Sequence, residues 1–363
     1  MLKLFEVSGY KCFNKKISLD FSDTRDYQFN TDCINNGFIG KLIIYGKNAI
    51  GKSAFSRALI DIRANTGSGF IPHDSDIYYL NADSSCTYAE FRYVFQFGID
   101  IIEYNYRKEA QQTLIYEKIT INDEILFEYD RKQAENCKVE GLRKMSPTLI
   151  LKFESVKSVL SYVVSNTPLT SDNPLRKTID FIERMTMYWN EAEGFVSQYQ
   201  FESVFTDRGA LLEFERFLKD SGINESLIML MDNDGKERIY FNKSTPLPFL
   251  KTASSGTLVL FELFILYKLA EKDHDTMLIL DEFDAYYHFE LSEQIVKMLQ
   301  KLEKTQVVFT SHNTNLLSNR FMRPDCLFVM TKNKLTSLPN STKRELREGH
   351  NLEKLYMSGE FDE

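Results

Sequence analysis

Hydrophobic residues along the chain follow two periods, and the change from one to the other predicts the order of the elements. Residues 2–22 alternate between apolar and polar around a polar turn at 9–16, which indicates two antiparallel strands. An apolar run at 41–45 precedes a glycine-rich turn and helical spacing over 53–64, so a strand, a loop and a helix are expected. Period-two spacing of aromatic and branched residues over 78–129 is typical of meandering antiparallel strands, which we expect within a mixed β-sheet.

A helical pattern replaces this alternation between residues 148 and 222. Apolar residues recur at helical spacing over 149–164, 175–198 and 210–218, and proline or glycine separates the three stretches. The segment 148–222 is therefore expected to be a helical insertion.

The last part of the chain alternates strands with helices. The expected elements are a hairpin at 228–241, helices at 257–271 and 291–303, and strands at 277–280, 306–310 and 327–330. This alternation predicts an α/β fold. The predicted organisation is an N-terminal lobe at 1–147, the insertion at 148–222 and a C-terminal lobe at 223–363.

The composition indicates which class of protein this is. With 363 residues, 43% hydrophobic and 13% aromatic, the chain can bury a large core. Its 44 Lys and Arg against 52 Asp and Glu give a net charge of −8, which argues against a surface that coats nucleic acid or anionic lipid. No apolar run reaches the roughly 20 residues of a membrane helix. The five cysteines form no CxxC pair, and the first residues lack the apolar run of a signal peptide, so we expect reduced thiols in a cytoplasmic protein.

The eight residues that follow the strand at 41–45 fit the pattern GxxxxGK[ST] of a phosphate-binding loop. They are Gly46, Lys47, Asn48, Ala49, Ile50, Gly51, Lys52 and Ser53. The glycines let successive backbone N–H groups point at one anion, and the following helix adds its positive N-terminus. Lys52 is expected to reach the β- and γ-phosphates, and the Ser53 hydroxyl to bind Mg²⁺.

Two acids end the apolar strand at 277–280. A carboxylate pair at the end of a buried strand needs a cation or a substrate, and Asp281 and Glu282 stand there. We expect Asp281 to hold Mg²⁺, usually through water, and Glu282 to orient and deprotonate the attacking water. Taken alone, the pair could also be a strand end that exposes two acids to solvent.

Two further pieces have the residue types that bind phosphate. Ser254, Ser255 and Gly256 lie in a hydroxyl-rich turn that opens the helix at 257–271, where they could bind an anion or serve only as an ordinary N-cap. His312 follows the strand at 306–310 and is placed to bond a γ-phosphate, although a lone histidine is more often structural.

These four pieces in this order resemble the ABC class of ATPases, in the branch of the RecF, SMC and OLD (overcoming lysogenisation defect) proteins. The stand-alone AAA-type ATPases of phage-defence and abortive-infection operons are the most similar. The resemblance rests further on Gly9–Phe13 after the opening strand, the SSGT form of the signature at 253–257, the DE-x-D-x-x-x-H run at 280–288 and the segment 349–356. It covers most of the chain, and 148–222 matches least.

The resemblance implies a two-lobed P-loop fold that works as a head-to-tail dimer with two ATP molecules between the copies. Lys52, Ser53, Asp281, Glu282 and His312 of one copy would then face Ser254 and Gly256 of the other. ATP holds such a dimer closed and hydrolysis releases it, because the γ-phosphate gains contacts only in the closed state. The family also binds Mg²⁺ through a glutamine, for which Gln96 is the candidate here.

The expected partner follows from a difference between this chain and its relatives. OLD nucleases have a nuclease domain after the ATPase, whereas only about 50 residues follow His312 here. The resemblance therefore implies an ATP-driven switch for a separately encoded nuclease or toxin.

Two alternatives stay open at this point. One is a RecF-like repair or recombination ATPase that binds DNA directly, and the other is an ATP-dependent scaffold with little turnover. The basic stretches at 11–16 and 343–347 could contact nucleic acid, but such stretches are more often a solvated face.

Overall fold

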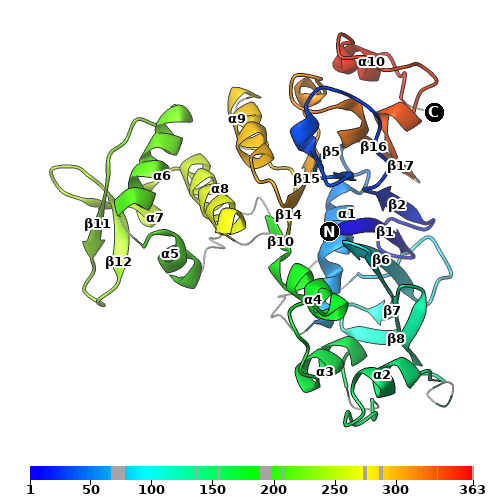
Figure 1. The fold of residues 1–363 in the computed structure, drawn as a ribbon. Coiled ribbons are helices and arrows are strands. Elements are labelled where there is room, and N and C mark those ends of the chain that lie inside the picture. The colour runs from blue at the N-terminus through cyan, green and yellow to red at the C-terminus, as the bar shows by residue number, and fades with distance from the viewer. Residues whose placement is uncertain are drawn as a thin grey trace. The chain divides into compact units, whose positions relative to one another are not determined.

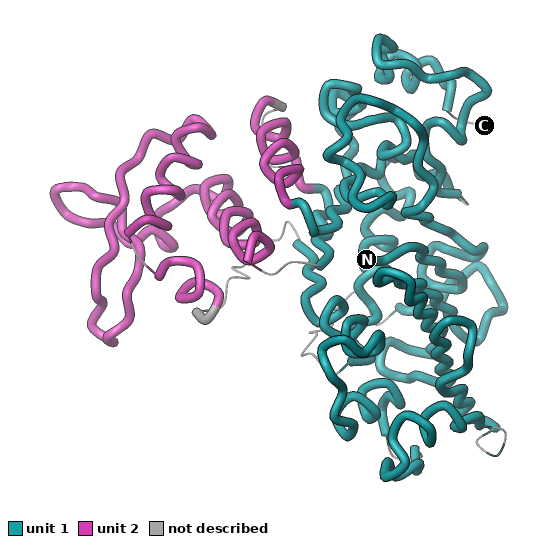
Figure 2. Tube along the Cα trace, in the orientation of Figure 1, with its two compact units in different colours: residues 1–188, 275–282, 303–363 teal, residues 189–274, 283–302 magenta. Residues whose placement is uncertain are grey.

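The computed structural model describes the chain except for residues 67–77, 134, 136, 154–155, 189–197, 207, 273–275, 286–288, 333 and 362–363 (Figure 1). The chain forms two compact units (Figure 2). Unit 1 comprises Met1–Tyr188, Asp275–Glu282 and Glu303–Glu363, and unit 2 comprises Trp189–His274 and Phe283–Leu302. Both units contain helices and strands, so the predicted α/β class is confirmed.

The first sheet of unit 1 has six strands in the order β2-β1-β6-β7-β8-β9. The strands are β1 (Leu2–Ser8), β2 (Ile17–Asp20), β6 (Ala89–Phe97), β7 (Asp100–Ala110), β8 (Thr113–Ile121) and β9 (Glu124–Asp130). Every pair is antiparallel, which confirms the predicted hairpin and meander. The expectation of a mixed sheet over 78–129 was wrong, because short turns join these strands. Asn122 and Asp123, both with positive φ, form such a turn between β8 and β9.

One face of this sheet is lined with aromatic rings. Phe91 and Tyr93 on β6 both stack on Tyr106 of β7, with ring centroids 4.9 and 5.9 Å apart. The period-two spacing of these residues places them on the same face, where they are fully buried. The aromatic content therefore serves the core of the sheet.

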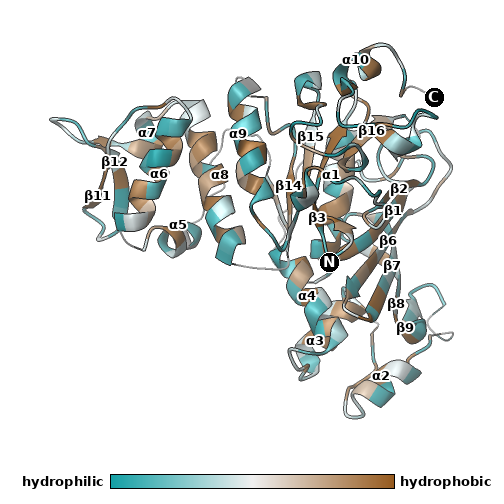
Figure 3. Cartoon of the chain, turned by 45° about the horizontal axis from the view of Figure 1, so that its top comes forward, coloured by the Kyte–Doolittle hydropathy of each residue, from teal (hydrophilic) through white to brown (hydrophobic). Residues whose placement is uncertain are grey.

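The second sheet of unit 1 has the order β10-β14-β15-β5-β16-β17. Its strands are β5 (Lys41–Tyr45), β10 (Thr186–Tyr188), β14 (Thr276–Leu280), β15 (Thr305–Ser311), β16 (Leu327–Thr331) and β17 (Lys334–Ser337). Neighbouring strands of this sheet are parallel, except that β17 runs antiparallel to β16, so this sheet is mixed. Every residue of β5, β14 and β15 is buried, as in a sheet covered on both faces. Hydrophobic residues dominate β14 (Figure 3).

Short helices complete unit 1. They are α1 (Lys52–Ile60), α2 (Glu140–Met145), α3 (Val159–Asn166), α4 (Pro174–Arg184) and α10 (Leu352–Met357), with 3-10 turns η1 (Thr31–Cys33), η2 (Asp61–Asn65), η5 (Thr314–Leu316), η6 (Pro324–Cys326) and η7 (Leu338–Asn340). A small ribbon pairs β3 (Ile34–Asn35) with β4 (Phe38–Ile39).

Two predicted helices are shorter than expected. The helix expected at 149–164 begins only at Val159, because the Ser158 side chain caps α3 by accepting a hydrogen bond from the Ser161 N–H. The helix expected at 175–198 ends at Arg184, because the next residues form β10 and pair with β14; residues 189–197 lie outside the described part.

Unit 2 packs helices on a small antiparallel sheet. It contains α5 (Gln198–Val204), α6 (Arg208–Asp220), β11 (Leu227–Met231), β12 (Glu237–Phe241), β13 (Leu247–Pro248), α7 (Phe249–Thr252), α8 (Ser255–Lys272) and α9 (Phe289–Gln300). Its core is phenylalanine-rich: Phe214 lies 5.1 Å from Phe264 and Phe249 lies 5.3 Å from Phe261, between ring centroids. The predicted hairpin is confirmed as β11 and β12.

The two units divide the chain at other points than the predicted segments 1–147, 148–222 and 223–363. Within the predicted insertion, α3 and α4 belong to unit 1, whereas α5 and α6 belong to unit 2. The three predicted segments therefore remain a proposal about how the functions are divided along the chain.

Among the described residues, no helix combines the length and the apolar character that crossing a membrane requires.

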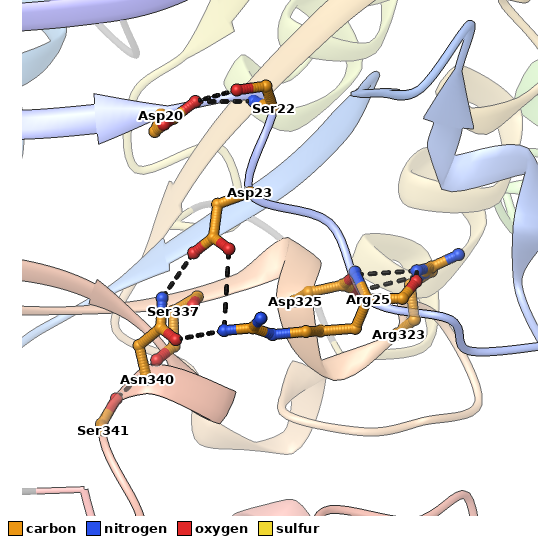
Figure 4. A network of polar contacts seen from close by, with 9 residues as sticks. All are labelled: Asp20, Ser22, Asp23, Arg25, Arg323, Asp325, Ser337, Asn340 and Ser341. Carbon is orange, nitrogen blue, oxygen red and sulfur yellow. Dashed lines mark hydrogen bonds and ion pairs between the residues drawn. The ribbon is translucent and has the colours of Figure 1, made fainter.

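A polar network in unit 1 joins residues 20–25 to residues 323–341 (Figure 4). The buried Arg323 guanidinium donates to both carboxylate oxygens of Asp325, at 2.8 and 2.7 Å. The same carboxylate accepts from the Arg25 backbone N–H at 2.6 Å, and the Arg25 side chain donates to Asn340 at 2.6 Å. The network therefore connects the loop after β2 to the segments before and after β16.

Candidate functional site

Three adjacent parallel strands of the second sheet end at the same edge. Ser311 of β15 pairs with Tyr45 of β5, and Leu280 of β14 pairs with Phe309 of β15. Neighbouring strands lie about 4.8 Å apart, so β5 and β14 are only about 10 Å apart. Chain segments that follow these strands therefore meet there, at the carboxyl ends of a parallel sheet, where such folds bind ligands.

The phosphate loop follows β5 at this edge, and its two fixed glycines are required by space. A Cβ on Gly46 would lie 2.8 Å from Ile50 Cγ2 and 3.0 Å from the Met330 carbonyl oxygen. Gly51 has a φ of 114°, and a Cβ there would lie 2.6 Å from Cys12 Sγ. The loop can therefore close tightly only with glycine at both positions.

Lys52 and Ser53 begin α1 directly after the loop. The Lys52 side chain is only 3% exposed, and its ammonium donates to the carbonyls of Gly46 at 2.9 Å and Lys47 at 3.2 Å. Ser53 is half-buried in the first turn. The N-cap is Gly51, which has no side chain to cap the first-turn N–H groups, so this helix end can receive an anion.

Asp281 follows β14 and connects the three elements of the site. Its side chain is 8% exposed, and Oδ1 accepts from Thr310 Oγ1 at 2.6 Å and from Ser56 Oγ at 3.3 Å. Thr310 lies on β15, and Ser56 lies on α1 one turn after Ser53. The predicted Mg²⁺ ligands Ser53 and Asp281 thus belong to elements that contact each other directly.

Glu282 has a backbone conformation that is unusual for a residue with a side chain. Its φ is 46°, in the left-handed region. Its backbone N–H donates to Thr310 Oγ1 at 2.8 Å. Backbone strain of this kind persists only where the surroundings enforce it, and it concentrates at functional sites.

His312 follows β15 and is exposed at the same edge. The turn after it is held by local hydrogen bonds, since Ser311 Oγ accepts from the Asn313 N–H at 2.9 Å and the Asn313 side chain accepts from the Asn315 N–H at 3.1 Å. Thr314 Oγ1 donates to Glu353 at 3.0 Å, which links the turn to α10. The structure thus brings His312, Glu282, Asp281 and the phosphate loop to one edge.

Ser254, Ser255 and Gly256 belong to unit 2, at the N-terminus of α8. Ser254 Oγ accepts from the Thr257 N–H at 3.2 Å, so the ordinary N-cap does form. Ser254 and Ser255 are exposed, and a Cβ on Gly256 would meet nothing within 4 Å. The turn is open to solvent, and its role toward phosphate stays a prediction.

Gln96 is not brought to the phosphate loop. Cys12 contacts that loop, and it lies just beyond the end of β1 at Ser8, which pairs with Glu90. Gln96 lies near the other end of β1, where its N–H donates to the Met1 carbonyl at 2.9 Å. The antiparallel register therefore separates Gln96 from the loop by nearly the length of β1. Residues 286–288 of the predicted DE-x-D-x-x-x-H run lie outside the described residues.

Ser56 was not singled out from the sequence, and Thr310 and Cys12 were given no role of their own there. Thr310 and Ser56 are fully buried hydroxyl residues that bond Asp281. A hydroxyl inside the apolar strand 306–310 was a signal that could have pointed to Thr310.

Partial desolvation beside the phosphate loop raises the pKa of the Cys12 thiol, so this thiol is neutral at pH 7.

Residues 42–318 match the family model described as AAA domain, putative AbiEii toxin, Type IV TA system. No curated protein matches the chain. Among solved structures, the chain is similar to an SMC head bound to the C-terminal winged-helix domain of ScpA, at 14% identity and a TM-score of 0.48, over 93% of this chain and 97% of that one. It is also similar to the SMC head domain from Thermotoga maritima, at 16% identity and a TM-score of 0.44, over 93% and 98%.

Proposed function

The chain belongs to the family of AAA domains described as putative AbiEii toxin of type IV toxin–antitoxin systems, and on this basis we propose that it is an ATP-hydrolysing switch. Membership of this family supports ATP binding. In the proposed cycle, two copies close head to tail around ATP, and hydrolysis reopens them. The closed and open states control a separately encoded effector, a nuclease or a toxin of a defence system. The observation that carries the proposal is that β5, β15 and β14 end at one edge of their sheet. The phosphate loop follows β5, His312 follows β15, and Asp281–Glu282 follow β14.

The phosphate loop supplies the binding of ATP. Phosphate oxygens would replace the Gly46 and Lys47 carbonyls as acceptors of the Lys52 ammonium, which is already positioned inside the loop. Backbone N–H groups at the start of α1 would donate to the same anion, and the helix dipole adds attraction. Binding therefore needs little rearrangement of Lys52.

Ser53 and Asp281 fit a magnesium ion. A hydroxyl and a carboxylate are oxygen donors of the kind that Mg²⁺ prefers. Bound Mg²⁺ would offset negative charge on the β- and γ-phosphates. The bonds from Thr310 and Ser56 fix the orientation of the Asp281 carboxylate from two directions.

Glu282 is the proposed general base. Its carboxylate would accept a proton from water as the water oxygen bonds to the γ-phosphorus and the bond to ADP breaks. His312, exposed at the same edge, would donate to a γ-phosphate oxygen. The open turn at Ser254 and Gly256 would bind the γ-phosphate held by a second copy, so ATP would be fully enclosed only in the dimer.

Light scattering of Glu282→Gln, with and without ATP and Mg²⁺, tests the proposal, and Lys52→Met serves as the control that cannot bind ATP. Assembly of Glu282→Gln that depends on ATP and is indifferent to short duplex DNA is the expected result. Assembly that requires DNA would favour a RecF-like repair ATPase. ATP-dependent assembly of the unsubstituted protein without measurable turnover would favour a scaffold. A Glu282→Gln protein that stays monomeric in ATP would overturn the sandwich model.

A further inference from the structure

One hydroxyl group joins the two acids of the site. Thr310 is fully buried on β15, and its Oγ1 donates to Asp281 Oδ1 at 2.6 Å and accepts from the Glu282 N–H at 2.8 Å. A hydroxyl carries a single proton, so giving it to Asp281 leaves a lone pair for Glu282. Both hydrogen bonds therefore form with a consistent direction.

The bond to Glu282 lies at the point where the backbone conformation is unfavourable. Glu282 has a φ of 46°, which residues with a side chain rarely adopt. Its N–H points toward β15 and is partly buried there, and because an N–H without an acceptor is costly away from water, it needs an acceptor. Thr310 Oγ1 is that acceptor, so the threonine favours the left-handed conformation that aims the Glu282 side chain.

The strand itself does not need a hydroxyl at this position. Every residue of β15 is buried, and valine has the same branched shape as threonine without the polar atom. Valine is close in volume, but its methyl group could neither donate to Asp281 nor accept from the Glu282 N–H. The hydroxyl of Thr310 is accounted for by its two bonds to the acids.

We propose that Thr310 is a positioning residue that aims the Asp281 carboxylate at the metal and the Glu282 carboxylate at the attacking water. The proposal rests on the proposed ATPase function and names a residue that acts through the two acids without touching ATP. Because the phosphate loop does not depend on Thr310, loss of the hydroxyl should affect turnover more than ATP binding.

The test compares Thr310→Val, which keeps the shape and removes the hydroxyl, with Thr310→Ser, which keeps the hydroxyl. Thr305→Val is the matched control, since Thr305 is a buried threonine at the opposite end of the same strand. Each variant is measured for thermal unfolding, for binding of ATP in EDTA by calorimetry, and for kcat and KM with Mg²⁺. Hydrogen exchange of the Glu282 amide is followed in the protein without nucleotide or metal.

For Thr310→Val we expect kcat to fall about 10- to 100-fold, as when other residues that orient ligands are lost. ATP binding in EDTA should change less than about twofold, and the Glu282 amide should exchange faster. Thr310→Ser should retain kcat within about threefold, and Thr305→Val should match the unsubstituted protein. Should Thr310→Val not fold, Thr310→Cys takes its place, since a thiol is similar in size and a weak hydrogen-bonding group.

The proposal is overturned if Thr310→Val keeps its kcat, or if Thr310→Ser loses as much as Thr310→Val. It is also overturned if the Glu282 amide exchanges at the same rate in Thr310→Val as in the unsubstituted protein. A protein that neither binds nor hydrolyses ATP would overturn the proposed function instead. The exchange rate would then still decide whether Thr310 holds the Glu282 backbone.

Discussion

The Lys108 ammonium lies 2.5 Å from a carboxylate oxygen of Asp61, and both side chains are almost completely buried. Asp61 directly follows the phosphate-loop helix α1, and it also accepts from the hydroxyls of Tyr79 at 2.9 Å and Tyr106 at 2.8 Å. Tyr93 donates to the Ala58 carbonyl of α1 at 2.7 Å. The far end of α1 is thus fixed to the first sheet by buried polar contacts.

This arrangement predicts that Lys108→Met destabilises the protein strongly. The substitution leaves the Asp61 carboxylate buried without its cation, which typically costs about 3–5 kcal/mol. In the double variant Asp61→Leu, Lys108→Met, no charge is buried, so we expect most of that loss to be recovered. Guanidinium unfolding of the two variants checks this, and equal loss in both would contradict the account.

A second prediction concerns pH and the buried Lys41. Its ammonium donates to the Thr305 carbonyl at 3.0 Å, and desolvation lowers the pKa of Lys41 to about 8. The unfolded chain, with a lysine pKa near 10.4, binds more protons between the two values, so stability rises as pH increases through this window. Relative to Lys41→Met, the gain from pH 7 to pH 10.5 should approach about 3 kcal/mol. Denaturant unfolding of both proteins at several pH values measures it; parallel curves would contradict the prediction.

Gly51→Ala should abolish ATP binding. A methyl group there would lie 2.6 Å from Cys12 Sγ at a φ of 114°, so the phosphate loop could not close. Gly349→Ala is the matched control, because a Cβ at Gly349 meets nothing within 4 Å. Calorimetric titration with ATP should show binding by the control only, and retained binding by Gly51→Ala would contradict the loop geometry.

The network of Figure 4 predicts unequal effects of two substitutions. Asp325→Ala would leave the buried Arg323 without its carboxylate, with an expected loss of about 3–5 kcal/mol. Arg25→Ala removes a half-exposed side chain that lies 3.6 Å from Asp23, and should cost less than about 1 kcal/mol. Thermal unfolding of the two variants distinguishes them. Similar losses would mean that burial does not set the strength of this network.

The sequence predicted the strands β5 and β14 and the start of α1 well, because the patterns that mark them are local. The loop depends on glycines within eight residues, and Asp281–Glu282 directly follow an apolar strand. Helix ends were predicted less well where distant contacts decide them. Arg184 ends α4 because the following residues pair with β14, about 90 positions further along the chain.

The contacts that hold the site were beyond local patterns. Thr310 bonds Asp281 only because β14 and β15 are neighbours, and Ser56 does so only because α1 packs close to this edge. Gln96 satisfied the local requirement for a strand residue, but the antiparallel register of β1 and β6 takes it away from the loop. Sequence periodicity gives the face of a residue but not its neighbour across the sheet.

The central place of β5 in its sheet has a consequence for synthesis of the protein. Its two neighbours, β15 and β16, begin at Thr305 and Leu327, so roughly 260 further residues must be made before β5 can pair. At about 5–20 residues per second, β5 stays unpaired for on the order of 13–50 s after its synthesis, with its backbone N–H and C=O groups without strand partners and its apolar faces uncovered. The nascent chain should therefore depend on chaperones during this interval, and a ribosome stalled before β15 should carry a chain that cannot yet retain ATP.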